Sequence, residues 1–507
     1  MFQADRQIEI PTKDILSFIF DNPDYDQDKP IYVDVHNPSR SISGKQARLI
    51  VRQLIAGFRA AGVQKGDCIA IHSFNDILYC MLVLAIIGVG GVYTGTNPAY
   101  TAAELGHHIK TSKSKFLISE PEILDPLLAA AKEHKIPRHH IWVFTPLKQQ
   151  IPGDMQSWKE LLKSGEEDWI RFDDLDTART TTAARLFSSG TTGLPKATTI
   201  THYNLVAQHE LTSKAHPPRP YPTHEKYGVT EVGVVPPIVI AIVMSPYSKT
   251  RPFMKTVRYA SCGAAPLDKE IQARFLKLLA DDAACNQVWG MTETSCIATM
   301  LPYTERDDTG SIGRLIPNLE AKLIDDDGRN ISAYGVRGEI CVRGPTITPG
   351  YFGNDKANTD SFDADGWFKT GDIGYCDEAT RKWYIVDRKK ELIKVRGFQV
   401  APPELEAVLL SHPQIIDAAV VGITLVRDDG EVPRAYVVRR PGPEGAKVTE
   451  KDVKVFLESR LAKYKALTGG VKFVDSIARN ASGKILKRLL REDCEKDLKA
   501  GRIGPKL

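Results

Sequence analysis

Small and hydroxyl-bearing side chains gather in residues 186–198, which read L-F-S-S-G-T-T-G-L-P-K-A-T. A loop of this composition can direct backbone N–H groups and hydroxyls at phosphate oxygens, while Lys196 neutralises their charge. It differs from a Walker A loop, in which glycine directly precedes the lysine and serine or threonine follows it, because Pro195 and Ala197 stand there. The segment predicts a phosphate-binding loop, with a surface turn as the alternative.

The first 180 residues, which must position this loop, alternate between helical and strand patterns. Short apolar strands alternating with helices predict a parallel sheet covered on both faces, and therefore an α/β fold. Asp125 followed by Pro126 is expected to begin one of the helices as cap and first residue. Helices are expected over 46–61, 77–87, 102–109 and 126–134, and strands over 68–73, 91–93, 115–119 and 141–144.

Length and composition restrict the class of protein. A chain of 507 residues is too long for one core, so a large region and at least one smaller domain are expected. Hydrophobic residues at 42% and charged residues at 26% are typical of globular proteins, and a net charge of +4 is too slight for a nucleic-acid partner. The eight scattered cysteines predict reduced thiols in an intracellular protein.

The apolar run at residues 77–93 predicts a buried helix followed by a strand rather than a membrane span, which needs about 20 apolar residues. The first residues lack the basic end and apolar run of a secretion signal. The last three residues, Pro505 to Leu507, resemble a peroxisomal address of the S-K-L type. We expect a cytoplasmic or a peroxisomal protein, with an ordinary frayed terminus as the alternative for these residues.

Further segments follow the phosphate-binding loop in a fixed order: S-C-G-A-A-P-L (261–267), V-W-G-M-T-E-T (288–294), W-F-K-T-G-D (367–372), D-R-K-K-E-L-I-K-V-R-G-F-Q-V (387–400) and N-A-S-G-K-I-L-K-R (480–488). Over nearly the whole chain, the set resembles the adenylate-forming (AMP-binding) superfamily, in particular 4-coumarate–CoA ligases and their fungal relatives. The resemblance implies a large multi-subdomain N-terminal region with parallel sheets (1–386) and a smaller mobile α+β C-terminal domain (387–507).

The resemblance also implies a reaction in two halves. A carboxylate attacks the α-phosphate of ATP, bound with Mg2+, to give an acyl-adenylate and pyrophosphate, and the thiol of coenzyme A then displaces AMP. Such a ligase would act on a small-molecule carboxylic acid, with secondary metabolite biosynthesis as one setting. Two alternatives stay open: a stand-alone adenylation enzyme that loads a carrier protein, and a non-catalytic remnant that binds nucleotide.

Residues of the N-terminal region receive roles through this resemblance. The β- and γ-phosphates would be held by Ser188, Ser189, Gly190, Thr191, Thr192, Gly193 and Lys196. The adenine would lie beside Gly263, Ala264 and Ala265, with Trp289, where relatives usually carry tyrosine, stacked on the purine and Gly290 next to it. Thr292 matches the α-phosphate contact and Glu293 the Mg2+ ligand. Asp372 and Arg388 match the pair that holds the ribose.

The C-terminal domain would present one face for each half of the reaction. Lys390 occupies the hinge position, and Lys484 matches the lysine that bridges carboxylate and phosphate during adenylation. Lys394 and Gln399 match the opposite face, which meets the AMP phosphate during thioester formation, and Gly397 falls where the pantetheine arm passes. For Lys484 the alternative is a solvated basic helix face.

The chain departs from the family between Asn204 and Pro236, where relatives carry several tens of residues more. The family pattern stops near Tyr221 and resumes near Glu225, and His224 at this seam matches no family residue. The lost residues include a strand, a helix and part of the acyl pocket wall. Three explanations stay open: an error in the gene model, a repacked working enzyme, or a product that does not catalyse.

Overall fold

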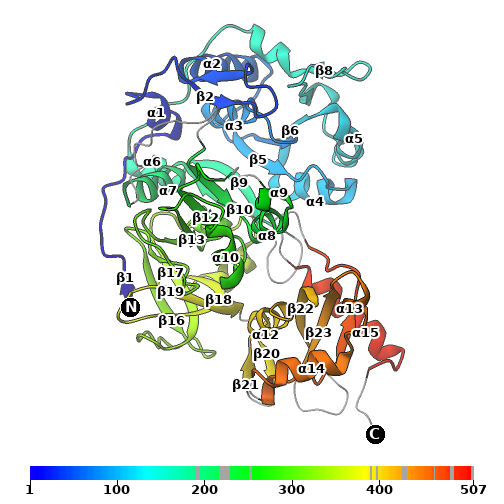
Figure 1. Cartoon of the computed structure of the whole chain (residues 1–507). Coiled ribbons are helices and arrows are strands. Elements are labelled where there is room, and N and C mark those ends of the chain that lie inside the picture. Colours follow the sequence, from blue (N-terminus) through cyan, green and yellow to red (C-terminus); the bar gives the residue numbers. More distant parts are fainter. Residues whose placement is uncertain are drawn as a thin grey trace.

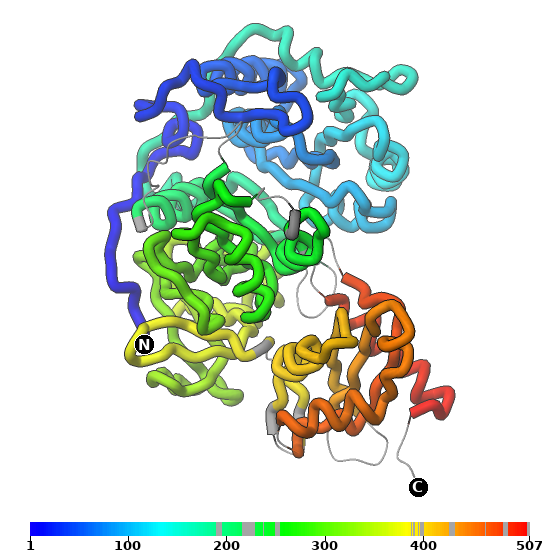
Figure 2. Tube along the Cα trace, in the orientation of Figure 1, coloured from blue at the N-terminus to red at the C-terminus, as the bar shows by residue number. Residues whose placement is uncertain are grey.

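The computed structural model describes residues 1–188, 195–215, 229–250, 254–388, 391–395, 398–424, 431–461, 463–479 and 485–503. A large region built around three main sheets extends to about residue 388, and the remaining residues gather in a smaller body (Figures 1 and 2). The predicted α/β fold class is confirmed, and all eight cysteines are free thiols. Within the described ranges, no helix is long and apolar enough to cross a membrane.

The first sheet has seven strands in the order β10-β9-β5-β4-β6-β7-β8, parallel except for the antiparallel pair β9–β10. The predicted alternation of strands and helices is confirmed. Its strands are β4 (Cys68–His72), β5 (Val92–Thr96), β6 (Ser114–Ser119), β7 (Ile141–Val143), β8 (Gln156–Ser157), β9 (Thr182–Ser188) and β10 (Lys196–Thr201). Its helices include α2 (Gly44–Ala60), α3 (Tyr79–Gly88), α4 (Ala102–Ser112) and α5 (Leu124–Glu133).

The predicted start of α5 is wrong by two residues. A 3-10 turn, Pro121–Ile123, runs directly into the helix, so Leu124 begins it and Asp125 lies in its first turn rather than at the cap. An acidic residue in the first turn still favours the helix through the helix dipole. Pro126 is tolerated there because the N–H groups of a first turn have no partner within the helix.

The second sheet is parallel, with the order β11-β12-β13, so β11 and β13 are its two edge strands among the described residues. Helix α8 buries Val239 and Val243 against it but leaves Ile238, Ile240 and Met244 between 40% and 50% exposed. These exposed side chains come shortly after the predicted interruption of the family pattern at Tyr221, His224 and Glu225. That interruption lies outside the described residues. The elements are β11 (Glu231–Val234), α8 (Pro236–Met244), α9 (Tyr247–Thr250), β12 (Tyr259–Cys262), α10 (Lys269–Leu276) and β13 (Ala284–Gln287).

The third sheet is antiparallel, with the order β1-β16-β17-β18-β19, and the first residues of the chain form its edge (Figure 1). In the register of its last two strands, Asp372 lies directly opposite Arg388. The strands are β1 (Phe2–Gln3), β16 (Glu320–Ile324), β17 (Gly338–Arg343), β18 (Phe368–Cys376) and β19 (Trp383–Arg388), and the pair β14 (Thr299–Met300) and β15 (Arg314–Leu315) lies between β13 and β16 in the chain.

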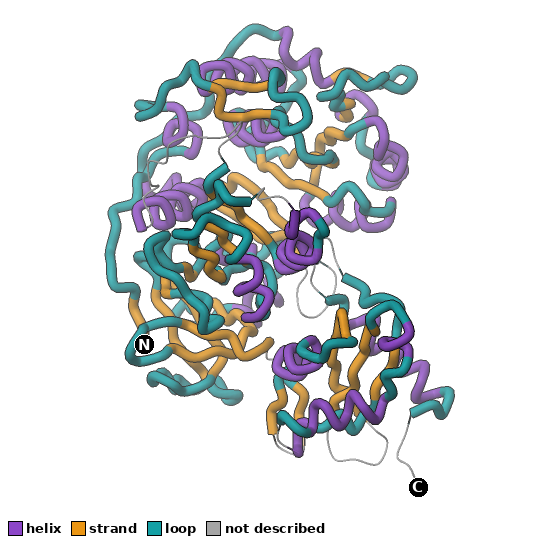
Figure 3. Tube along the Cα trace, in the orientation of Figure 1, coloured by secondary structure: helices purple, strands orange, loops and turns teal. Residues whose placement is uncertain are grey.

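The C-terminal body combines a three-stranded sheet, a two-stranded hairpin and helices around its own apolar core (Figure 3). Strand β19 ends at Arg388 and the hairpin begins at Ile393. The strands are β20 (Ile393–Val395), β21 (Phe398–Val400), β22 (Ile415–Thr424), β23 (Glu431–Arg439) and β24 (Val471–Phe473); the helices include α12 (Pro402–Leu410), α14 (Glu450–Glu458) and α15 (Lys487–Lys499).

Candidate active site

Three of the predicted nucleotide-binding residues meet at one buried carboxylate. Asp372 Oδ1 lies 3.1 Å from Arg388 Nε on the neighbouring strand, and Asp372 Oδ2 accepts a hydrogen bond of 2.8 Å from Trp289 Nε1. Only 4% of the surface of Asp372 is exposed. Each carboxylate oxygen of Asp372 therefore has its own donor. Together, Arg388 and Trp289 restrict the rotation of the carboxylate.

The backbone on both sides of Trp289 is tightly constrained. Residues 289 and 299 exchange backbone hydrogen bonds of 3.2 and 3.1 Å, and the N–H of Ala298 also donates to the carbonyl of Trp289. The next residue, Gly290, must lack a side chain, because a Cβ there would lie 1.6 Å from the carbonyl oxygen of Cys296. The indole consequently leaves a rigid turn rather than a mobile loop.

A second group surrounds Glu293, the predicted metal ligand, whose side chain is buried. Its Oε1 accepts a hydrogen bond of 2.8 Å from the hydroxyl of Tyr351, and the ammonium of Lys196 lies 4.5 Å from the centre of the Tyr351 ring. Burial and then the Glu293 carboxylate raise the pKa of Tyr351, so this hydroxyl stays protonated and remains a donor.

Tyr351 was missed by the sequence analysis. It lies in the segment T-P-G-Y-F-G (348–353), where Gly350 has a φ of 142°, and the neighbouring backbone pairs with β10 through the bond from Thr199 N to Gly350 O. A glycine directly before an aromatic residue is a weak signal in isolation. The contact with Glu293 depends on a bridge between residues 198 and 351, which no local pattern reveals.

Replacing Tyr351 with phenylalanine should raise the Mg2+ concentration that gives half-maximal pyrophosphate release by about tenfold. The reason is that a hydrogen bond to a charged group, worth roughly 1.5–3 kcal/mol, orients the proposed metal ligand. Steady-state titration with Mg2+ at saturating ATP measures the effect. Tyr375→Phe, in a tyrosine stacked on Tyr384, is the matched control. An unchanged Mg2+ dependence in Tyr351→Phe would contradict the role of its hydroxyl.

The two ends of the predicted phosphate-binding loop lie opposite each other. Ser188 ends β9, Lys196 begins β10, and the two residues are partners in the antiparallel ladder. The hydroxyl oxygen of Ser188 is buried, and the hydroxyl of Tyr351 interacts with it. A hydroxyl at this place can also donate to a phosphate oxygen.

The predicted adenine ledge follows the carboxyl end of the parallel strand β12, where α/β sheets commonly bind ligands. Gly263 comes directly after this strand, and a Cβ there would approach Val288 to 3.0 Å. Ala264 has a positive φ of 70°, and Ala265 continues the turn. Thr292 begins a short 3-10 helix, Thr292–Thr294, that leads into the left-handed residue Ser295.

The part of the chain that the structure describes does not bring the remaining predicted residues to this site. Lys394 on β20 and Gln399 on β21 are partners in their hairpin, and only their backbone is described. The others lie outside the described residues: Ser189, Gly190, Thr191, Thr192, Gly193, Lys390, Gly397 and Lys484. Their roles stay predictions.

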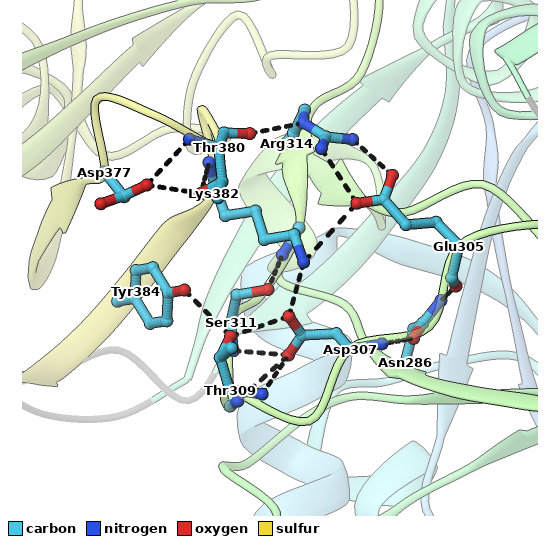
Figure 4. Close-up of polar contacts among 12 residues, drawn as sticks. Asn286, Glu305, Asp307, Thr309, Ser311, Arg314, Asp377, Thr380, Lys382 and Tyr384 are labelled. Atoms are coloured by element: carbon cyan, nitrogen blue, oxygen red, sulfur yellow. Dashed lines mark hydrogen bonds and ion pairs between the residues drawn. The ribbon is translucent and has the colours of Figure 1, made fainter.

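An ion-pair cluster of Glu305, Asp307, Arg314 and Lys382 holds the start of β19, and Asp307 and Lys382 are its buried members (Figure 4). Lys382 Nζ lies 2.8 Å from Asp307 Oδ1 and 3.5 Å from Glu305 Oε1, and Arg314 Nη1 lies 2.7 Å from Glu305 Oε2. Asp307 also accepts hydrogen bonds from the backbone N–H groups of residues 309–311. Because Lys382 directly precedes β19, this cluster fixes the strand that presents Arg388.

Replacing Asp307 with asparagine should lower the free energy of unfolding by about 3 kcal/mol at pH 7, because it removes one partner of a buried ion pair. Burial alone would raise the pKa of Asp307, but the bonds from Lys382 and Thr309 outweigh it and place the pKa below 3.8. The contribution is therefore complete above the unfolded value of 3.8 and is lost as pH falls through the lowered pKa. Urea denaturation at pH 7 and at pH 3 measures both effects.

In acid, the difference between Asp307→Asn and the unsubstituted protein should shrink. The control is Asp308→Asn, which removes the exposed carboxylate of the adjacent residue and should leave the free energy of unfolding nearly unchanged at both pH values. Equal losses in the two variants would contradict a specific role for the ion-pair cluster.

Comparison with known proteins shows the family of this chain. The family described as AMP-binding enzyme matches residues 20–223 and 211–352, and the AMP-binding enzyme C-terminal domain matches residues 404–484. The chain therefore belongs to the AMP-binding enzyme family. The predicted class, an ATP-dependent, AMP-forming acid–thiol ligase of the acyl-CoA ligase type, is confirmed by this membership and by relatives about 50% identical over nearly the whole chain.

Two of these relatives come from Aspergillus niger. One is the phenylacetyl-CoA ligase epaB, 50% identical over 98% of this chain and 100% of its own length; the other is the acyl-CoA ligase azaF, 51% identical over 96% and 100%. Among solved structures, ATP-bound MatB from Rhodopseudomonas palustris superposes with a TM-score of 0.81 at 26% identity, covering 95% of this chain and 98% of MatB.

Proposed function

We propose that this protein couples an aryl or other medium-to-large carboxylic acid to coenzyme A through an acyl-adenylate, in fungal-type secondary metabolite biosynthesis. The observation that carries the proposal is the buried Asp372 held by Arg388 and Trp289, because a fixed carboxylate can accept bonds from two ribose hydroxyls. The relative named as a phenylacetyl-CoA ligase makes phenylacetate the first acid to test.

In the adenylation half, Lys196, Ser188 and the loop between them hold the departing β- and γ-phosphates. Gly263, Ala264 and Ala265 border the adenine, and Thr292 contacts the α-phosphate. Catalysis of phosphoryl transfer rests on such positioning and charge neutralisation. The buried hydroxyl of Ser188 and the position of Lys196 at the start of β10 support these roles.

Glu293 suits Mg2+ bound together with ATP. Within the described ranges, no group of three or more His, Cys, Asp or Glu side chains is placed to hold a metal. Mg2+ is commonly held by one or two carboxylates together with substrate phosphates and waters rather than by a protein cage, so a single oriented carboxylate fits it. When bound, the ion neutralises phosphate charge, while Tyr351 fixes the direction of Glu293.

For the thioester half, we place the domain boundary at residues 386–387 and assign the hinge to Lys390. Rotation about this hinge exchanges Lys484 for Lys394 and Gln399, with Gly397 beside the pantetheine arm. Strand β19 ends at Arg388 and β20 begins at Ile393. Only a short segment of the chain therefore joins the two strands, which supports a hinge between them.

The test is acid-dependent pyrophosphate release with Mg-ATP, followed by mass spectrometry of the coenzyme A thioester, over phenylacetic, cinnamic, fatty and amino acids. Turnover of an aryl or fatty acid supports the proposal. Protection against thermal unfolding by ATP without any pyrophosphate release would instead favour a non-catalytic remnant. Transfer to a carrier protein but not to coenzyme A would favour a stand-alone adenylation enzyme.

The shortened segment after Asn204 bears on this test. The family matches this chain in two pieces, 20–223 and 211–352, which overlap at residues 211–223. The alignment to epaB extends over 545 residues and is therefore longer than this chain. Both observations support the interpretation that positions near Tyr221 are missing. The intact mass of the endogenous protein separates the explanations. A mass several kilodaltons above 56.2 kDa indicates a longer native chain, and a matching mass makes the short pocket wall real.

The compartment is either the cytoplasm or the peroxisome. Residues 505–507 lie outside the described ranges, so import stays a prediction from the Pro-Lys-Leu sequence. A fluorescent protein fused upstream of these three residues, compared with the same fusion lacking them, distinguishes the two compartments.

A further inference from the structure

The tryptophan at position 289 makes a contact that the expected stacking role does not require. Its indole Nε1 donates to Asp372 Oδ2 at 2.8 Å, while the indole itself is 92% buried in the apolar cluster that also contains Phe368 and Trp383. Neither phenylalanine nor tyrosine carries a donor at this place on its ring. The bond joins two motifs that lie 83 residues apart in the chain.

We propose that Trp289 is a positioning residue for the ribose of ATP, acting through Asp372. This inference rests on the proposed function, in which Asp372 accepts bonds from the ribose hydroxyls. Arg388 engages Oδ1 and Trp289 engages Oδ2, so the two donors together fix the rotation of the carboxylate about its terminal bond. The ribose hydroxyls would then meet a carboxylate whose two oxygens point in fixed directions.

The surroundings make the indole a rigid donor. The backbone of Trp289 is bonded to Thr299 in both directions, and Gly290 leaves no space for a larger residue. The backbone of Asp372 is also held, because its N–H donates to Thr370 Oγ1 and the N–H of Gly371 donates to Glu339 Oε1. Without the indole N–H, Asp372 Oδ2 loses the donor that comes from Trp289, and the carboxylate can rotate away from the ribose.

The experiment compares the binding of ATP with that of 2′,3′-dideoxy-ATP, which has the same base and phosphates but no ribose hydroxyls, by isothermal titration calorimetry. The unsubstituted protein should prefer ATP. Trp289→Phe keeps an aromatic ring for stacking but loses the N–H, and should reduce this preference by about tenfold, the order expected for a hydrogen bond to a charged group. Trp383→Phe, the same change in the same apolar cluster, should leave the preference unaltered.

A second variant guards against a folding defect. Incorporation of 3-benzothienylalanine at position 289 keeps the size and shape of indole but replaces the N–H with sulfur, and should reproduce the loss of preference. If both variants weaken the two nucleotides equally, Trp289 only stacks and the inference is wrong. If the unsubstituted protein itself binds both nucleotides alike, the ribose role of Asp372 is wrong, which is a separate failure of the proposed function.

Discussion

Replacing Lys484 with alanine should abolish acid-dependent pyrophosphate release while leaving thioester formation from a supplied acyl-adenylate largely intact. The proposed ammonium neutralises charge that develops only while the α-phosphate is attacked, and loss of one such group typically costs about 10²–10³-fold in rate. The second half-reaction uses the other face of the C-terminal domain, so it should not require this lysine.

Two assays measure the effect: pyrophosphate release with ATP and acid, and coenzyme A thioester formation from synthetic acyl-adenylate. Lys496→Ala removes an exposed lysine from the following helix α15 and is the control. If Lys484 only belongs to a solvated basic face, both variants will behave like the unsubstituted protein. Equal loss of both half-reactions in Lys484→Ala would also contradict the proposed role.

Replacing Asp372 with alanine should weaken ATP binding by roughly tenfold to a hundredfold. The change removes the acceptor proposed for the ribose hydroxyls, and charge-assisted hydrogen bonds contribute roughly 1.5–3 kcal/mol each. It also leaves Arg388 and the indole N–H of Trp289 without this partner. ATP titration monitored by calorimetry gives the affinity directly.

Asp372→Asn is the informative companion, because its carbonyl oxygen can still accept from Trp289 while the charge opposite Arg388 is lost. It should therefore bind ATP more tightly than Asp372→Ala. The control is Glu378→Ala, which removes an exposed carboxylate from the turn between β18 and β19. An ATP affinity unchanged in Asp372→Ala would remove Asp372 from the nucleotide site.

Periodicity and motif order were enough to predict much of this molecule. Alternating apolar segments predicted β4 to β7 and their helices, since a buried parallel sheet requires apolar strands at short intervals. The start of α5 could not be predicted, because a 3-10 turn and an α-helix share nearly the same local preferences. The resemblance predicted that Asp372 and Arg388 act as a pair, and the register of β18 and β19 places them directly opposite each other.

In the candidate site too, individual residues could be predicted from the sequence, whereas the contacts between them could not. Motifs predicted roles for Glu293, Asp372 and Trp289, because each lies in a segment that resembles one of the family's. They did not reveal that Tyr351 contacts Glu293 or that Trp289 donates to Asp372, since these contacts join residues 58 and 83 positions apart. Such pairs follow from tertiary packing, and a single sequence carries no direct signal for them.

The exposed face of α8 also affects how this chain behaves at high concentration. Ile238, Ile240 and Met244 are exposed on the helix that follows β11, which is one of the two edge strands of its sheet among the described residues. An unpaired strand edge with apolar neighbours promotes association between copies, and hydrophobic attraction weakens on cooling. Solutions of the 507-residue chain should therefore remain clear in the cold and turn cloudy on warming, well before the molecule unfolds.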